Sequence, residues 1–148
     1  MVKAIICGSR NFCNYTFLDE KCREVFGSIS NTVMFGDYEK DITIIEIISG
    51  GAKGADELGE RFAFNNSIEI KKFPAQWDRY GKQAGMLRNT EMINYAARKE
   101  HEDDYGMSIA FWDGESKGTK QAIDYAKRMK LDVKVFIYKG RKTNESNN

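Results

Sequence analysis

Histidine, paired cysteines and long apolar runs are scarce in this sequence, and each scarcity excludes a class of protein. The three cysteines, Cys7, Cys13 and Cys22, show no Cys-x-x-Cys spacing, so no disulfide framework is expected. His101 is the only histidine, which leaves no set of zinc ligands. No apolar run approaches the roughly 20 residues that span a bilayer, and the first apolar segment, 4–7, is too short for a signal peptide. We therefore expect a cytoplasmic protein with reduced thiols, no metal and no cofactor.

An excess of charge of one sign is also missing. The formal net charge is +1 over 148 residues. Proteins that bind nucleic acid or anionic membranes over a broad surface carry a strong basic excess, so we expect neither as a partner. A local anion site is still compatible with this charge, because it needs only a few donors. The length is normal for one domain, which can bury a core without disulfides or metals.

Strand-like and helix-like patterns alternate along the chain. Strands are predicted at 2–7, 42–48, 68–73, 107–112 and 133–138, and helices at 17–29, 55–64, 86–99 and 119–129. Lysines in the third strand predict a place near the sheet edge, and a polar loop is predicted at 31–40. This β-α repetition predicts an α/β fold, a Rossmann-like three-layer sandwich with a parallel sheet of about five strands. We expect one domain over 1–140 and a polar tail at 141–148.

Three predicted strands end in small or glycine-rich turns. These are Gly8-Ser9-Arg10, the segment 50–56 (Gly-Gly-Ala-Lys-Gly-Ala-Asp) and the segment 113–119 (Asp-Gly-Glu-Ser-Lys-Gly-Thr). Parallel sheets bind ligands beyond the C-terminal ends of their strands, so all three turns are expected at one edge. Glycine lets main-chain N–H groups approach a phosphate, and helices beginning near Gly54 and Gly118 would aim free N–H groups at it. The alternative is that these glycines only form tight turns.

The segment 73–89 is long for a strand-to-helix connection, and such loops are usually functional. Trp77 and Tyr80 could stack on a base, and Lys82 could contact a phosphate. Trp77 could instead plug the core beneath the loop.

Arg88 and Asn89 end the same segment. Arg88 could contact a phosphate, and Asn89 could supply hydrogen bonds. Arg88 could instead pair with Asp78 or Asp56.

Three carboxylates at the expected ligand edge, Asp56, Asp113 and Glu115, are the candidates for catalysis. Asp56 and Asp113 could also accept hydrogen bonds from ribose hydroxyls. An aspartate at a helix start is more often a cap, which is the alternative for Asp56.

Several segments, which follow one another along the chain in the order of the family's motifs, together resemble the YspA-type branch of the SLOG superfamily. They are Gly8-Ser9-Arg10, 49–56, 73–77 (Phe-Pro-Ala-Gln-Trp), 81–85 (Gly-Lys-Gln-Ala-Gly), Arg88-Asn89 with Met92, and 109–114 (Ile-Ala-Phe-Trp-Asp-Gly) through Gly118-Thr119. The resemblance implies a Rossmann-like fold and recognition of a nucleotide or nucleotide-derived signal. Relatives include cytokinin-activating phosphoribohydrolases, DNA-processing proteins of the DprA type and sensor domains of bacterial and phage defence. Such proteins often dimerise, so a homodimer or higher homo-oligomer is possible.

The sequence departs from the phosphoribohydrolase motif Pro-Gly-Gly-x-Gly-Thr-x-x-Glu. An insertion precedes Gly118, and Ala122 stands where the glutamate is expected. The main hypothesis is therefore binding of a nucleotide-derived phosphate ligand, as a sensor or, if the protein is phage-encoded, as a sequestering protein. The alternatives are an N-glycosidase resembling the phosphoribohydrolases and DprA-like nucleic-acid binding.

The expected ligand-binding residues come from the turns, the long loop and the resemblance. They are Gly8, Ser9, Arg10, Gly50, Gly51, Ala52, Lys53, Gly54, Asp56, Trp77, Lys82, Arg88, Asn89, Asp113, Gly114, Ser116, Gly118 and Thr119.

Overall fold

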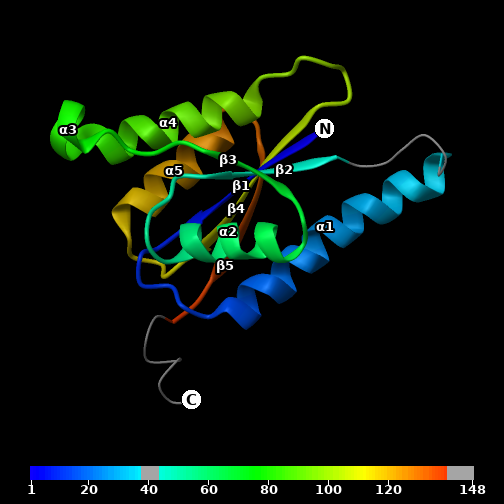
Figure 1. Ribbon diagram of the computed structural model, residues 1–148, viewed down its shortest axis with the longest axis horizontal. Helices are drawn as coiled ribbons and strands as arrows, with labels where there is room; N and C mark the ends of the chain where they lie inside the picture. The colour runs from blue at the N-terminus through cyan, green and yellow to red at the C-terminus, as the bar shows by residue number, and fades with distance from the viewer. Residues whose placement is uncertain (38–43, 140–148) are drawn as a thin grey trace.

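A parallel sheet forms the centre of the computed structural model, which describes residues 1–37 and 44–139 (Figure 1). Within this part of the chain the strands are β1 (Val2–Gly8), β2 (Ile45–Ser49), β3 (Glu69–Lys72), β4 (Tyr105–Trp112) and β5 (Asp132–Ile137). Their order across the sheet is β3-β2-β1-β4-β5, and every neighbouring pair is parallel. The predicted α/β fold is confirmed, as is the edge position of the third strand.

Helices cover both faces of the sheet (Figure 1). Residues of α1 (Tyr15–Asp37) and α2 (Ala55–Asn65) share one apolar core with the sheet, and residues of α4 (Ala84–Ala97) and α5 (Lys117–Arg128) share another. The chain winds outward from β1 toward β3, then crosses back to β4. The topological switch point therefore lies between β1 and β4, where open α/β sheets bind their ligands.

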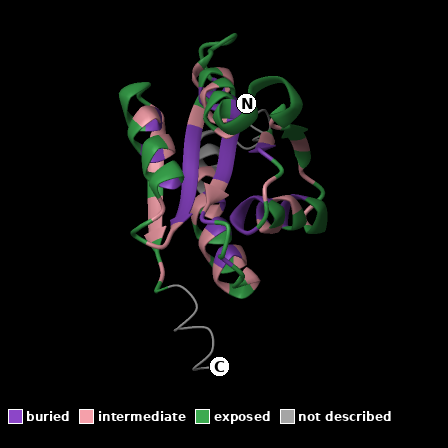
Figure 2. Cartoon of the chain, turned by 90° about the vertical axis from the view of Figure 1, so that its left-hand side faces the viewer, coloured by how far each residue is buried: buried purple, intermediate pink, exposed green. Residues whose placement is uncertain are grey.

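The central strands are buried on both sides, as their continuous apolar runs require. Figure 2 shows buried strands between two helical layers. Ile6 and Ile47 belong to the core under α1 and α2, whereas Ile5 and Ile48 belong to the core under α4 and α5. The alternation of side chains along each strand thus fills both layers.

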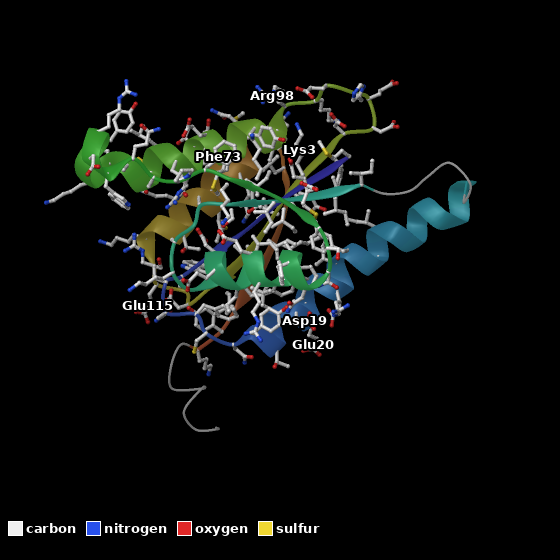
Figure 3. The ribbon with its side chains drawn as sticks, in the orientation of Figure 1. Lys3, Asp19, Glu20, Phe73, Arg98 and Glu115 are labelled. Atoms are coloured by element: carbon white, nitrogen blue, oxygen red, sulfur yellow. The ribbon has the colours of Figure 1, made fainter. Side chains whose placement is uncertain are left out.

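A buried lysine ties β1 to the end of α4, at the end of the sheet away from Glu115 (Figure 3). The Lys3 ammonium donates hydrogen bonds to the carbonyl oxygens of Arg98 (3.0 Å) and Tyr95 (3.4 Å). It also lies over the Tyr95 ring, 4.5 Å from the centroid. Carbonyls at a helix C-terminus lack partners within the helix and favour a cation, so Lys3 anchors α4 to the sheet.

The structure corrects several predicted boundaries. Residues 31–37 continue α1 rather than forming a loop, because no proline interrupts the segment and each added residue contributes a helical hydrogen bond. The strand predicted at 42–48 is β2 from Ile45, whose ladder partner is Val2, the first residue of β1. Positions 38–43 and the predicted tail at 141–148 lie outside the described residues.

The long connection after β3 is largely helical rather than irregular. It contains α3 (Trp77–Tyr80) and a 3-10 turn, η1 (Gly81–Gln83), and α4 begins at Ala84. None of the residues in α3 and η1 is buried. Of the helices in the described part, none is long and apolar enough to cross a membrane.

Candidate functional site

A cavity of about 600 Å³ lies at the C-terminal ends of β1 and β4, and we call it the switch-point cavity. Its volume falls in the range of small-molecule sites. It is lined by Cys7, Gly8, Ser9, Arg10, Asn11, Ala52, Asp56, Trp77, Lys82, Gly85, Met86, Arg88, Asn89, Asp113, Ser116, Gly118, Thr119, Gln121 and Ala122. The three turns and the long connection, far apart in the sequence, therefore meet at one place.

Most of the expected ligand-binding residues line this cavity, but some do not. The expected residues outside its lining are Gly50, Gly51, Lys53, Gly54 and Gly114, together with the catalytic candidate Glu115. Other lining residues were not predicted from the sequence, namely Cys7, Asn11, Gly85, Met86, Gln121 and Ala122. Helical spacing could have found two of these, because Gln121 and Ala122 lie three and four residues after Gly118 and so share its helix face.

Ser9 joins the turns that follow β1 and β4. It is buried, its N–H donates to the Phe111 carbonyl (3.0 Å), and its hydroxyl accepts a hydrogen bond from the Asp113 N–H (3.2 Å). The floor of the cavity is thereby fixed between the two central strands.

The turn before α2 is locked against the turn after β1. Gly54 has a φ of +81°, and a Cβ there would lie 2.4 Å from the Ser9 carbonyl oxygen. The same oxygen accepts a hydrogen bond from the Ala55 N–H (3.4 Å), and the first turn of α2 carries Asp56 and Glu57. Ser9 thus accepts from the first N–H group of this helix, and the two carboxylates disfavour an anion there. The N–H groups of Asp56 and Glu57 have no acceptor among the described residues, so a phosphate at the start of α2 stays a prediction.

Asp56 is a buried carboxylate in the lining of the cavity, and its residue is 6% exposed. One oxygen, Oδ2, accepts a hydrogen bond from the Ala52 N–H (3.2 Å), and no donor reaches the other oxygen among the described residues. The cap of α2 is Gly54, so the alternative role of Asp56 as the helix cap is wrong.

Burial is the main reason that the pKa of Asp56 is raised to about 6. The nearby charge of Glu60 also raises it, while the Ala52 N–H, Arg88 and Arg10 lower it. A carboxyl group with this pKa changes its charge near neutral pH.

Arg88 is a buried cation that no carboxylate neutralises at ion-pair distance. Its residue is 7% exposed and lines the cavity. Its guanidinium donates to the side-chain oxygen of Asn89 (2.8 Å) and to the carbonyl oxygen of Gly50, and both acceptors are uncharged. Among the described residues it forms no salt bridge, so the expected alternative pairing with Asp78 or Asp56 is wrong.

The start of α5 differs from that of α2, because it carries no acidic residue in its first turn. Gly118 and Thr119 line the cavity there, and their N–H groups have no acceptor among the described residues. A Cβ on Gly118 would meet no atom within 4 Å. The positive end of α5 is therefore open to the cavity.

Asp113 shapes the turn that leads into α5. Its Oδ1 accepts hydrogen bonds from the N–H groups of Ser116 (2.8 Å) and Glu115 (2.9 Å). Partial burial raises the pKa of Asp113, but these hydrogen bonds, with one from Ser9, outweigh it, and the pKa is lowered from its ordinary value. Asp113 thus orders the turn as an ionised group, and Glu115 is exposed outside the cavity lining.

Trp77 forms part of the cavity wall rather than a plug in the core. Its side chain belongs to α3 and the residue is 49% exposed. The ring packs near the backbone of Gly85 at the start of α4, where a Cβ added to this glycine would lie 3.5 Å from the ring. Met86 and Lys82 also line the cavity, and both are exposed. Two cavity residues, Trp77 and Lys82, therefore lie on segments without buried residues.

The cavity contains neither a metal-ligand cluster nor an activated thiol. The described residues include no group of three or more histidine, cysteine or acidic side chains that could hold a metal. None of the cysteines Cys7, Cys13 and Cys22 forms a disulfide bond. Burial raises the pKa of the Cys7 thiol to about 12, so Cys7 lines the cavity as a protonated, uncharged thiol.

The chain is similar to a protein encoded by a bacteriophage. The chain is 33% identical over 97 residues to the "Gene 61 protein" of Mycobacterium phage D29, which covers 61% of this chain and 70% of that protein. No family model matches the chain. No solved structure matches it either.

Proposed function

Since this chain belongs to the protein family of the Mycobacterium phage D29 Gene 61 protein, and since that name states no activity, we propose from the site itself that the switch-point cavity binds a phosphate-bearing ligand of the nucleotide type. The observation that carries the proposal is Arg88, a buried guanidinium on the cavity lining with only uncharged acceptors. A buried charge without an ion-pair partner is costly. The Asp56 carboxylate is close enough to feel the charge of Arg88 but forms no salt bridge with it, and an anionic ligand would supply that partner.

The start of α5 supports the same kind of ligand. The N–H groups of Gly118 and Thr119, the helix dipole and the guanidinium of Arg88 all favour negative charge in one cavity. Because Gly118 has no Cβ and open space around it, a phosphate oxygen can approach its N–H closely. We therefore place the phosphate at α5 rather than at α2.

The wall formed by Trp77 and Met86 suits the base of a nucleotide. An exposed tryptophan ring offers a stacking surface, and stacking on a base contributes about 1–3 kcal/mol. A cavity of about 600 Å³ is large enough for a nucleoside monophosphate. Because Mycobacterium phage D29 encodes a relative, sequestration of a host nucleotide signal is one role that such binding could take; sensing is the other.

The test is calorimetric titration with inorganic phosphate and AMP of the wild-type protein and of Gly118→Asp. The new carboxylate would stabilise the N-terminus of α5 by about 0.3–1 kcal/mol while occupying the phosphate position. We expect binding of both ligands to be lost although the melting temperature is unchanged or raised. Equal binding by the variant and the wild type would reject this site.

A second candidate function, hydrolysis of an N-glycosidic bond, is favoured by one observation. Asp56 is a cavity carboxyl whose pKa of about 6 suits a general acid or base near neutral pH. Incubation with nucleoside monophosphates followed by chromatography tests this role. Free base that is formed by the wild type and not by Asp56→Asn would support hydrolysis; absence of free base would leave binding as the function.

A further inference from the structure

The two sides of the switch-point cavity have opposite polarity. Gly118 and Thr119 of α5 present unpaired N–H groups from one layer of helices, whereas Asp56 of α2 presents an unpaired carboxylate oxygen from the other layer. A ligand that fills the cavity must therefore offer an anion at one side and a hydrogen-bond donor at the other. Inorganic phosphate carries a P–OH donor of its own, but it is much smaller than a cavity of about 600 Å³.

We propose that Asp56 selects the ligand by accepting a hydrogen bond from a hydroxyl group, so that the cavity takes a sugar phosphate, free or within a nucleotide. This inference rests on the proposed function. Buried carboxylate oxygens are normally hydrogen-bonded, yet Oδ1 of Asp56 has no donor among the described residues while Oδ2 has the Ala52 N–H. The missing donor is therefore assigned to the ligand.

The charges around Asp56 favour a neutral donor over a cationic one. Arg88 from α4 and Arg10 from the turn after β1 both act on this carboxylate. A ligand ammonium group would meet these two guanidinium groups, and charges of like sign repel. A sugar hydroxyl donates a hydrogen bond without adding charge.

The experiment compares ribose 5-phosphate with inorganic phosphate as calorimetric ligands for Asp56→Asn, Asp56→Ala and the wild type. Asparagine can still accept the hydrogen bond from Ala52, so the fold is retained, but the negative charge is gone. Because hydrogen bonds to charged groups are the stronger ones, we expect affinity for ribose 5-phosphate to fall about ten- to hundredfold. Affinity for inorganic phosphate should be unchanged or should rise slightly.

Glu57→Gln is the matched control. Glu57 is the next residue in the same helical turn, but it is exposed and does not line the cavity. The control should bind both ligands as the wild type does, and melting temperatures verify that all variants fold.

The outcomes separate the two proposals. An equal loss of affinity for both ligands in the Asp56 variants, or no loss for either, would overturn the selection of a hydroxyl and leave phosphate binding intact. If AMP binding depends on Asp56 while ribose 5-phosphate binding does not, the donor belongs to the base and the inference is again wrong. If the wild type binds neither phosphate nor its esters, the proposed function fails, and this inference fails with it.

Discussion

The guanidinium of Arg88 lies directly against the backbone of Gly50. A Cβ at Gly50 would lie 2.6 Å from Nη1 of Arg88, and the Gly50 carbonyl accepts a hydrogen bond from the same nitrogen. Gly50 is not part of the cavity lining. Its missing side chain makes room for the arginine, so Gly50 would contribute to the proposed ligand binding only indirectly.

Gly50→Ala should therefore displace Arg88. The clash is with a flexible side chain, so the fold should lose only about 1.5–3 kcal/mol, the range of a lost hydrogen bond to a charged group. Phosphate affinity should fall about tenfold or more, because the guanidinium moves. Calorimetric titration and urea denaturation measure the two effects. Gly51→Ala is the neighbouring control, since a Cβ there meets nothing within 4 Å; if it weakens binding as much, Arg88 is not the cause.

Asp56→Asn should stabilise the protein in a pH-dependent way. Burial raises the pKa of Asp56 to about 6 from an ordinary value of 3.8, so the unfolded state releases this proton at lower pH than the folded state does. Stability therefore falls as pH rises from about 4 to 6 and remains lower above pH 6. The groups that face Asp56 are Arg88 of α4, Arg10 of the turn after β1, Glu60 of α2 and Cys7 of β1.

The variant should exceed the wild type by about 1–3 kcal/mol at pH 7.5 and by much less at pH 4. Chemical denaturation at both pH values measures the difference. Glu57→Gln, in the same turn but exposed, should show no such pH dependence. A stabilisation by Asp56→Asn that is equal at both pH values would contradict the assignment of the ionisation to Asp56.

Trp77→Ala should separate recognition of the base from recognition of the phosphate. Removing a stacking surface costs about 1–3 kcal/mol per base, so affinity for AMP should fall roughly five- to hundredfold while affinity for inorganic phosphate is retained. Half of Trp77 is exposed, so the fold should be little affected. Tyr80→Ala removes another exposed aromatic side chain of α3 that does not line the cavity, and it should bind AMP normally.

Gly54→Ala should damage the fold rather than the ligand contacts. A Cβ at Gly54 would meet the backbone carbonyls of Ser9 (2.4 Å) and Arg10 (2.5 Å), and its φ of +81° is strained for any other residue. We expect a loss of about 2–4 kcal/mol from overpacking and strain together. Gly51→Ala, with a φ of +74° but open space, should lose only about 1 kcal/mol. If urea denaturation shows a comparable loss of stability in both variants, backbone strain alone, and not the clash with Ser9 and Arg10, determines the effect.

The parallel sheet, and the edge of it at which the candidate site lies, could be predicted from the sequence for a simple reason. Strand ends are marked by small residues, and parallel strands bring their C-terminal ends to one edge, so Gly8, Asp113 and Gly118 could be placed together without coordinates. The apolar run at 2–7 and the lysines of β3 likewise indicated central and edge positions, which the sheet order confirms.

The sequence could not show which polar groups already have hydrogen-bond partners within the protein and which are left for a ligand. The starts of α2 and α5 look equivalent as glycine-containing turns, yet Ala55 donates to Ser9 whereas Gly118 faces open space. Similarly, nothing local indicates that Arg88 contacts Gly50 rather than an aspartate. These contacts join segments far apart in the chain, and they follow from packing rather than from composition.

The segment from Trp77 to Gln83 contributes side chains to the cavity while burying none of its own. Substitutions there alter what the cavity admits at little cost to folding, whereas changes at Ser9 or Gly54 disturb the framework itself. For the proposed ligand binding, new preferences are therefore most accessible through this segment, and variant libraries that test for altered selectivity are best confined to it.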